Sequence, residues 1–397
     1  MSRPDILTVD ERLGSAVAAA EFVRDPYPAY RDFRAAPGWH SPAGYQVFSG
    51  YHDVIAILRD HATFGQEGIP YPNFHVLDPP DHTRLRRLVA KPFTQRAANR
   101  QEAHITEIVD GLIDEASARG RMDLMTDFAL RLPARVAASM FAIPIEDSGR
   151  WNQWLWDIGR FRGKTWYSHA SSQDDQDAAK AAATDSAEYF RTLIDQRKAT
   201  RGSDIVSGLL DAREGDDKLT DEEILFSLVL LLGGSLHTTA SQIGNTVRAL
   251  FEHPRALVDV VADPGLVGGA VDEALRFDGA LQAEYRVARQ DAEVGGIRVV
   301  AGTSVIIVNA AANRDPSVFP HPDVFDIRRE NSGMHLTFGS GVHRCLGAQL
   351  ARMELVVALT RLTSRLHGLR PDGPPVQHGY DRLRGLSSLP VTWDGVA

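Results

Sequence analysis

Residues 338–347 read Phe-Gly-Ser-Gly-Val-His-Arg-Cys-Leu-Gly and contain Cys345, the one cysteine of this 397-residue chain. Apolar residues recur with helical spacing over residues 346–362. We therefore expect Cys345 to stand at a helix N-terminus, where free backbone N–H groups and the helix dipole favour a thiolate. The three glycines of the stretch permit a tight turn and let a flat ligand approach the backbone closely.

A cysteine in this setting has several possible roles. Shielded from water by Phe338, it is well placed to be an axial thiolate ligand of haem iron. Taken alone, a free cysteine is more often a buried, inert residue. A zinc site built on His343 and Cys345 lacks two further ligands at a familiar spacing, and the local signatures of cysteine proteases are absent.

The composition argues against several classes of protein. With 43 Lys and Arg against 52 Asp and Glu, the formal net charge is −9, which disfavours a nucleic-acid partner held by phosphate attraction. A single cysteine excludes an intramolecular disulfide and suits a reducing, cytoplasmic compartment. The longest apolar stretch, residues 224–236, is shorter than the roughly 20 residues that a bilayer requires, and no export signal begins the sequence. We expect no membrane partner.

Helical periodicity dominates the chain, and strand-like runs are short. The clearest helical patterns cover residues 25–35, 104–119, 185–198, 221–252, 266–277 and 346–366. Short strands are expected at residues 45–48, 294–300 and 304–308. The polar, alanine-rich residues 168–185 are the one mild candidate for a hinge. The pattern predicts a mainly α fold with small β-sheets, in a single domain over residues 1–397.

Residues 221–252 predict one long buried helix, because its first half is apolar all round. Thr220 and Glu223 form a capping-box pattern at its start. The pattern breaks at residues 233–239 (Gly-Gly-Ser-Leu-His-Thr-Thr), where Thr238 can donate to the carbonyl of Gly234 and distort the helix. On this segment alone, a tight helix crossing explains the glycines equally well.

A second motif favours the haem-ligand role of Cys345 over the other roles considered above. Glu273 and Arg276 lie three residues apart on one helix face, and the cysteine stretch begins 65 residues after Glu273. Together these motifs resemble the haem-thiolate signature of the cytochrome P450 family. The resemblance covers nearly the whole chain, through residues 78–86 (an early haem-contacting helix), 234–239 (the oxygen-binding kink), 312–316 and 325–328 (the late meander). It implies the P450 fold, with haem between the long central helix and the cysteine-loop helix.

The resemblance also implies the cofactor, which is non-covalent haem b with Cys345 as the axial ligand of the iron. Phe338, Gly339 and Gly347 would contact the haem. Glu273 and Arg276 would form a buried structural ion pair that is joined to the meander near Arg328.

Two haem propionates require cations when they are partly buried. The resemblance gives this role to His82, Arg86, Arg286 and His343. His82 and Arg86 are four residues apart and would share one helix face. Without the resemblance, such a pair is more typical of a solvated helix face.

The implied activity is that of a monooxygenase, which inserts one oxygen atom from O2 by hydroxylation, O-dealkylation or epoxidation. Thr238 matches the alcohol that the family uses in proton delivery. The acid that usually precedes this alcohol is replaced here by His237. The glycine that usually lies two residues before the acid is replaced by Ser235. A histidine can relay protons near neutral pH, so three hypotheses stand for His237: it relays protons, it faces the substrate, or it is only structural.

The substrate is the least determined feature. By family position the pocket would include Tyr71, Phe74, Leu232, Ser235, Leu236, Leu281 and Leu386. Four of the six tryptophans lie between residues 151 and 166, which suits a small or medium apolar or aromatic molecule. The same rings could serve only helix packing.

Electrons must come from another protein, because no nucleotide-binding motif occurs in the chain. The resemblance implies a ferredoxin with its ferredoxin reductase, which would dock on a local basic patch: Arg84, Arg87, Lys91, Arg344 and Arg352. An alternative is a peroxide-using or oxidative-coupling enzyme of the same fold, for which the missing acid is the only hint. A non-catalytic haem sensor is a remote third possibility.

Overall fold

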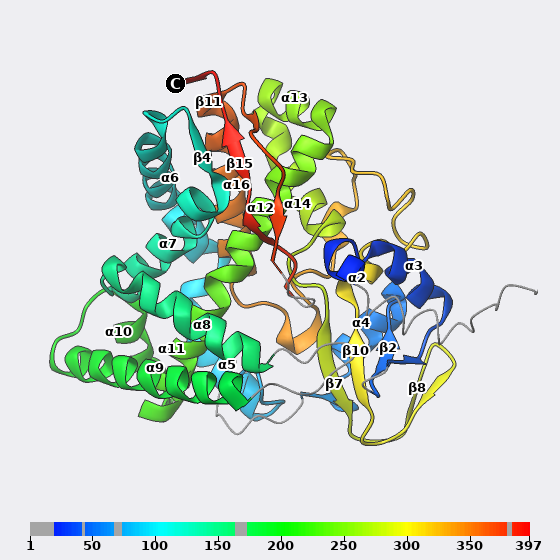
Figure 1. Ribbon diagram of the computed structural model, residues 1–397. Helices are drawn as coiled ribbons and strands as arrows, with labels where there is room; N and C mark the ends of the chain where they lie inside the picture. The colour runs from blue at the N-terminus through cyan, green and yellow to red at the C-terminus, as the bar shows by residue number, and fades with distance from the viewer. Residues whose placement is uncertain (1–19, 42–43, 67–73, 163–172, 379–382) are drawn as a thin grey trace, which may run out of the picture.

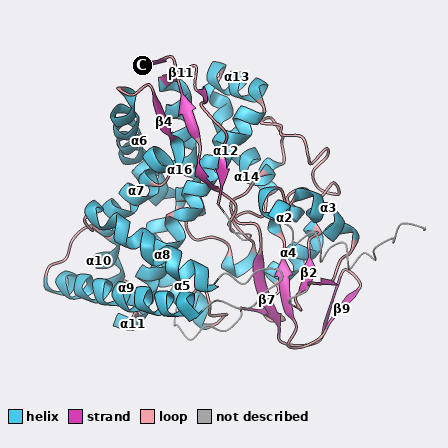
Figure 2. Cartoon of the chain, viewed as in Figure 1, coloured by secondary structure: helices cyan, strands magenta, loops and turns pink. Residues whose placement is uncertain are grey.

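The computed structural model describes residues 20–41, 44–66, 74–162, 173–378 and 383–397. Helices make up most of these residues, and the strands gather mainly at one side of the molecule (Figures 1 and 2). The longer helices are α3 (Tyr27–Ala35), α4 (Tyr51–Arg59), α5 (Asp81–Val89), α6 (Gln95–Ser117), α7 (Arg131–Phe141), α8 (Ser148–Arg162), α9 (Gln173–Ala199), α11 (Asp221–Ser235), α12 (His237–Glu252), α13 (Pro254–Ala262), α14 (Val267–Phe277) and α16 (Ala348–Arg365). Shorter helices are α2 (Ala20–Arg24), α10 (Ile205–Leu210) and α15 (Asn309–Ala312). The predicted mainly α fold is confirmed.

The largest sheet has the strand order β1-β2-β10-β7-β3, in which β10 runs parallel to β2 and the other pairs are antiparallel. Its strands are β1 (Trp39–His40), β2 (Gln46–Phe48), β10 (Ser304–Ile307), β7 (Glu284–Ala288) and β3 (Phe64–Gly65). The remaining described strands form small sheets: β4 (Arg121–Asp123) with β15 (Pro390–Thr392) and β12 (Arg370–Pro371), β5 (Arg213–Glu214) with β6 (Asp217–Lys218), β8 (Ala292–Val294) with β9 (Ile297–Val299), β11 (Leu366–His367) with β16 (Gly395–Val396), and β13 (Val376–Gln377) with β14 (Leu386–Ser388).

The predicted single helix over residues 221–252 is wrong in one respect, because the structure divides it into α11 and α12 at Leu236. The capping box at its start is confirmed, since Thr220 and Glu223 bond to each other's backbone. The break also has the predicted cause: Thr238 Oγ1 donates to Gly234 O at 2.7 Å and so replaces a regular helical bond there.

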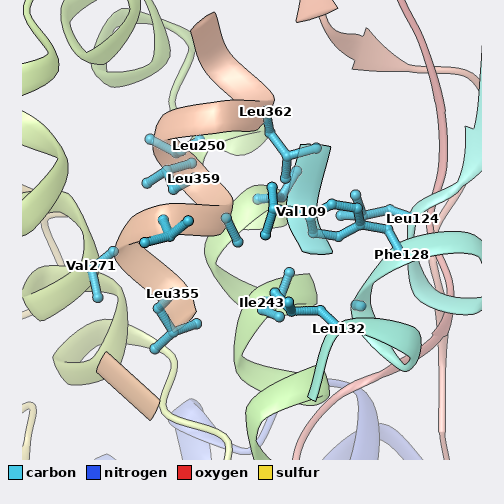
Figure 3. Packing of buried hydrophobic residues seen from close by; sticks show 14 of the residues in the cluster. Val109, Leu124, Phe128, Leu132, Ile243, Leu250, Val271, Leu355, Leu359 and Leu362 are labelled. Carbon is cyan, nitrogen blue, oxygen red and sulfur yellow. The ribbon is translucent and has the colours of Figure 1, made fainter. Parts of the chain in front are cut away.

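Helix α12 lies at the centre of the molecule (Figure 1), where α14, α16 and the one-turn π-helix at Leu124–Ala129 pack against it. Figure 3 shows the resulting core, in which Ile243 and Leu250 of α12 lie among Leu355, Leu359 and Leu362 of α16. Each fully buried leucine of this kind contributes about 1.5–3 kcal/mol. The core therefore fixes α12 relative to α16, the helix that follows the cysteine.

Residues 221–252 are long and apolar enough to cross a membrane by composition, with a mean hydropathy of 1.6 in their most apolar window. In the structure, 61% of that window is buried inside the protein, which is typical of a core helix.

The hinge predicted at residues 168–185 is wrong for its described part. Helix α9 begins at Gln173 and continues through the alanine-rich stretch to Ala199. The alanines supply helix propensity, and Ala179 and Ala182 are buried. The strand predicted at residues 294–300 is also corrected, since Gly295 and Gly296 turn the chain between β8 and β9.

Candidate functional site

The loop that carries Cys345 is held in place by its backbone. Cys345 N–H donates to Phe338 O at 2.8 Å, which closes the loop upon itself. Gly341 has φ +70°, and a Cβ atom there would lie 2.3 Å from Leu58 O of α4. No larger residue therefore fits at position 341 without moving α4.

Cys345 precedes α16 rather than beginning it, which corrects the predicted helix N-terminus by three residues, because α16 starts at Ala348. The side chain is exposed on one side, while the surrounding protein raises the pKa of its thiol by burial. The N–H of Gly347 and the positive charge of Arg86 act against burial. Since burial dominates, the thiolate expected from the helix dipole needs a cation at the sulfur to form.

His82 of α5 is a buried polar residue near this loop whose ring is not hydrogen-bonded to the protein. Its ring is 2% exposed, and neither ring nitrogen has a hydrogen-bond partner. It lies 4.5 Å from the ring of His343, and burial, the first cause, lowers its pKa to about 4. A buried, unsatisfied imidazole costs free energy, so this site is built for an acceptor such as a carboxylate.

The other three predicted propionate ligands lie in the same region. His343 Nε2 is 2.9 Å from Asp78 Oδ1, and Arg86 Nη2 donates to the carbonyl of Arg344, beside the cysteine. Arg286 is 3% exposed and pairs with Glu284 at 3.1 Å. One sulfur ligand and a cluster of nitrogen donors fit a metal porphyrin with two carboxylates, so the residues present fit haem.

Thr238 of α12 is half-buried, and its hydroxyl hydrogen is directed at Gly234 O. Gly234 itself is exposed, so the broken turn opens onto free space. Ser235 faces back into the helix, where its Oγ donates to Leu232 O at 2.9 Å.

His237 is 8% exposed and faces α8. Its Nε2 is 3.1 Å from Asn152 Oδ1, and its ring stacks on Trp156 with centroids 4.3 Å apart. Burial, with a smaller contribution from His378, lowers the pKa of His237 to about 4, so the ring is neutral at pH 7. Asn152 and Trp156 are one helical turn apart on α8, so His237 ties α8 to α12.

Glu273 and Arg276 form the predicted buried pair. Both side chains are fully buried, and two hydrogen bonds of 2.7 and 2.8 Å join them. The predicted link to the meander near Arg328 is present, because Arg329 Nε and Asp326 N–H donate to Glu273 Oε1 at 3.2 and 2.9 Å. Arg328 itself pairs with Asp259 on the surface.

Most of the predicted pocket residues pack in the core. Phe74, Leu232 and Leu236 belong to the same buried cluster as Trp151 and Trp154, so these two tryptophans serve helix packing. Leu386 of β14 lies in the other large cluster, and Leu281 forms a bridge with Leu383. Tyr71 lies outside the described residues. As pocket residues all of them stay predictions.

The predicted basic patch is less positive than the sequence indicates. Arg84 pairs with Asp217 and Glu223. Arg87 pairs with Glu214, and Arg352 pairs with Asp272. Of the five residues named for this patch, Lys91 and Arg344 are the exposed ones for which the structure shows no side-chain ion pair.

Several residues at the site were not predicted from the sequence. Asn152 and Asn309 gave no signal, because their partners are distant in the chain. Glu284 could have been found, because residues two apart on a strand share a face and Arg286 was already named. Glu354 of α16 is buried with Oε2 unsatisfied, and an acid within a buried helical pattern was a usable signal.

The family model described as Cytochrome P450 matches residues 265–375. The chain is 41% identical to nocardicin C N-oxygenase of Nocardia uniformis subsp. tsuyamanensis, over 93% of this chain and 96% of that protein. It is 38% identical to vitamin D(3) 25-hydroxylase of Pseudonocardia autotrophica, over 94% of each. Among solved structures, P450BioI in complex with hexadec-9Z-enoic acid ligated acyl carrier protein matches with TM-score 0.89 and 32% identity, over 95% of this chain and 100% of that one.

Proposed function

This chain belongs to the cytochrome P450 family and is a haem-b-dependent monooxygenase, and we propose that it oxidises a small or medium apolar or aromatic molecule with electrons from a ferredoxin. The overall reaction consumes O2, two electrons and two protons, and yields the oxygenated substrate and one water. Bound haem supplies the activation of O2 and the transfer of one oxygen atom. The predicted cytoplasmic location is part of this proposal, since a single thiol suits a reducing compartment.

The observation that carries the proposal is the buried and unsatisfied His82, whose ring lies 4.5 Å from that of His343, two residues before Cys345. Cys345 would ligate the iron, and His82, Arg86, Arg286 and His343 would hold the propionates. The bonds of His343 to Asp78 and of Arg286 to Glu284 already orient both side chains. The site is therefore partly preorganised for its cofactor.

Thr238 is the residue that we propose for proton delivery. Its hydroxyl hydrogen is bonded to Gly234 O, so its oxygen is free to accept a hydrogen bond from water in the broken turn. Each turnover requires two protons, and a hydroxyl held at this break can orient the water that supplies them.

For His237 the contacts support a positioning role rather than a relay. Asn152 Oδ1 can only accept a hydrogen bond, so His237 Nε2 carries the proton and cannot pass it on. With a pKa of about 4, the ring is also a poor proton store at pH 7. The proton relay stays a prediction of the sequence.

Reconstitution tests the proposed electron source and the substrate class together. Candidate ligands are first screened with the holoenzyme for a shift of the iron spin-state spectrum, and those that bind are incubated under 18O2 with NADPH, ferredoxin reductase and ferredoxin. We expect one labelled oxygen atom per product and a rate that falls as salt is added. Arg344→Glu should slow this reaction, whereas Arg352→Glu, at an already paired position, should slow it less.

Two results would contradict the proposal. Turnover with hydrogen peroxide but not with the ferredoxin system would favour the peroxide-using alternative. A coupled product without labelled oxygen would favour oxidative coupling.

A further inference from the structure

Glu284 of β7 is a buried carboxylate beside the cysteine loop that the reaction does not call for. It lies two residues before Arg286, on the same face of the strand. Its Oε2 is 3.1 Å from Arg286 Nη2, and its Oε1 accepts a hydrogen bond of 2.7 Å from Asn309 Nδ2. The side chain is 16% exposed, so these two partners and the protein around it replace most of its hydration.

The cysteine loop passes directly over this carboxylate. Gly339 has φ +66°, and a Cβ atom at this position would lie 3.2 Å from Glu284 Oε1. The neighbouring residue, Phe338, provides the carbonyl that accepts the N–H of Cys345. Glu284 therefore lies against Gly339, the residue next to the Phe338 carbonyl that holds the cysteine. Because residue 339 is a glycine, no side chain separates the carboxylate from the backbone of the loop.

The carboxylate is ionised at neutral pH. Burial opposes ionisation, but Arg286, the hydrogen bond from Asn309 and the nearby His75 outweigh it and hold the pKa of Glu284 below its usual value. These groups come from β7, from α15 and from the loop before α5, so no single element controls the charge.

The charges around the haem can then be counted. With haem bound, the thiolate and two propionates would be negative, whereas the ferric porphyrin core, Arg86 and Arg286 would each carry one positive charge, so these charges cancel. Glu284 adds one further negative charge and shares Arg286 with a propionate. Reduction of the iron adds one electron to this already negative site, which a fixed negative charge opposes.

We propose that Glu284 is a positioning and charge-setting residue: it orients Arg286 toward the haem and lowers the reduction potential of the iron. The proposal rests on haem being bound through Cys345, but not on any substrate or redox partner. The couple is the one-electron reduction of ferric to ferrous iron, and in the test below the electrode supplies that electron through the mediators.

Spectroelectrochemical titration of the substrate-free holoenzyme, with dye mediators, tests this proposal. Glu284→Gln removes the charge and keeps an oxygen that can accept from Asn309. We expect the equilibrium constant for reduction to rise about tenfold, which equals 59 mV for a one-electron couple. Glu284→Asp keeps the charge and should stay near the wild-type potential.

Glu293→Gln is the matched control, because it makes the same chemical change at an exposed position of β8 and should leave the potential unchanged. An unaltered potential in Glu284→Gln would overturn the proposal. So would a Glu284→Gln protein that takes up no haem or loses its thiolate spectrum, since Glu284 would then be needed for the site to form at all. Because no turnover is measured, failure of the proposed substrate class or ferredoxin leaves this test intact.

Discussion

At the residue scale, the site depends on two side chains, the partly exposed Cys345 and the buried His82. Cys345 is held by a backbone bond to Phe338, yet burial raises the pKa of its thiol. His82 is buried with both ring nitrogens unsatisfied. A buried thiolate and an unsatisfied buried imidazole are both unfavourable alone. Haem would stabilise both, because its iron would bind the sulfur and its propionates would accept hydrogen bonds from the imidazole.

His237 offers a prediction that separates two of its three proposed roles, the structural role and the proton relay. His237→Gln keeps an N–H that can donate to Asn152, but it cannot be protonated. If the residue ties α8 to α12, we expect this variant to couple electrons to product nearly as well as wild type, while His237→Ala couples severalfold less. Product formed per NADPH consumed, with peroxide as the by-product, is the measurement. A glutamine variant that is as uncoupled as the alanine variant would show that His237 relays protons.

Glu354 gives a prediction about pH. Burial raises the pKa of its carboxyl group to about 8, from its usual value of 4.5. Between these values the folded protein keeps a proton that the unfolded chain releases, so this group makes the protein less stable as the pH rises. Glu354→Gln should therefore be more stable than wild type at pH 7, by about 3 kcal/mol at most.

Urea unfolding of the holoenzyme at pH 5.5 and 7.5 measures this effect. The advantage of Glu354→Gln should grow between the two values, whereas Glu107→Gln, an exposed control on α6, should show no such trend. An advantage that is equal at both pH values would contradict the raised pKa.

At the element scale, α14 and the meander are joined by the Glu273–Arg276 pair. Arg276 donates to the carbonyls of Asn313 and Pro322, and Glu273 accepts the N–H of Asp326. Neither charge is exposed, so removal of one leaves the other buried and unpaired. The pair therefore fixes the segment that leads into the cysteine loop.

We predict that Glu273→Ala is destabilised by about 3–5 kcal/mol, because an uncompensated buried charge remains. It should also lose haem during gel filtration, seen as a lower ratio of haem to protein absorbance. Arg328→Ala removes the surface pair with Asp259 and should leave the stability nearly unchanged, because exposed ion pairs contribute little. A Glu273→Ala protein that stays loaded with haem and stable would refute this account of α14.

At the scale of the whole molecule, features that depend on local spacing could be predicted from the sequence. The capping box at Thr220, the bond from Thr238 to Gly234 and the Glu273–Arg276 pair each join residues within one turn of a helix. Family resemblance placed the cysteine and the four side chains proposed for the propionates in one region, and the structure brings them together.

Features that depend on tertiary contacts could not be predicted. The bond from Arg329 to Glu273, the bond from His237 to Asn152 and the contact of Glu284 with Gly339 all join segments that are far apart in the chain. The burial of four predicted pocket residues in the two large core clusters could not be predicted either: Phe74, Leu232, Leu236 and Leu386. Apolar periodicity does not distinguish a helix or strand face that packs in the core from one that binds a ligand.

The ferrous carbonyl spectrum of the purified protein tests the central claim, which is that the sulfur of Cys345 ligates the haem iron. We expect the wild-type protein to show the long-wavelength Soret band of thiolate ligation, and Cys345→Ser to lose it. Colourless protein that takes up no haem, or a carbonyl spectrum like that of a histidine-ligated globin, would contradict the account.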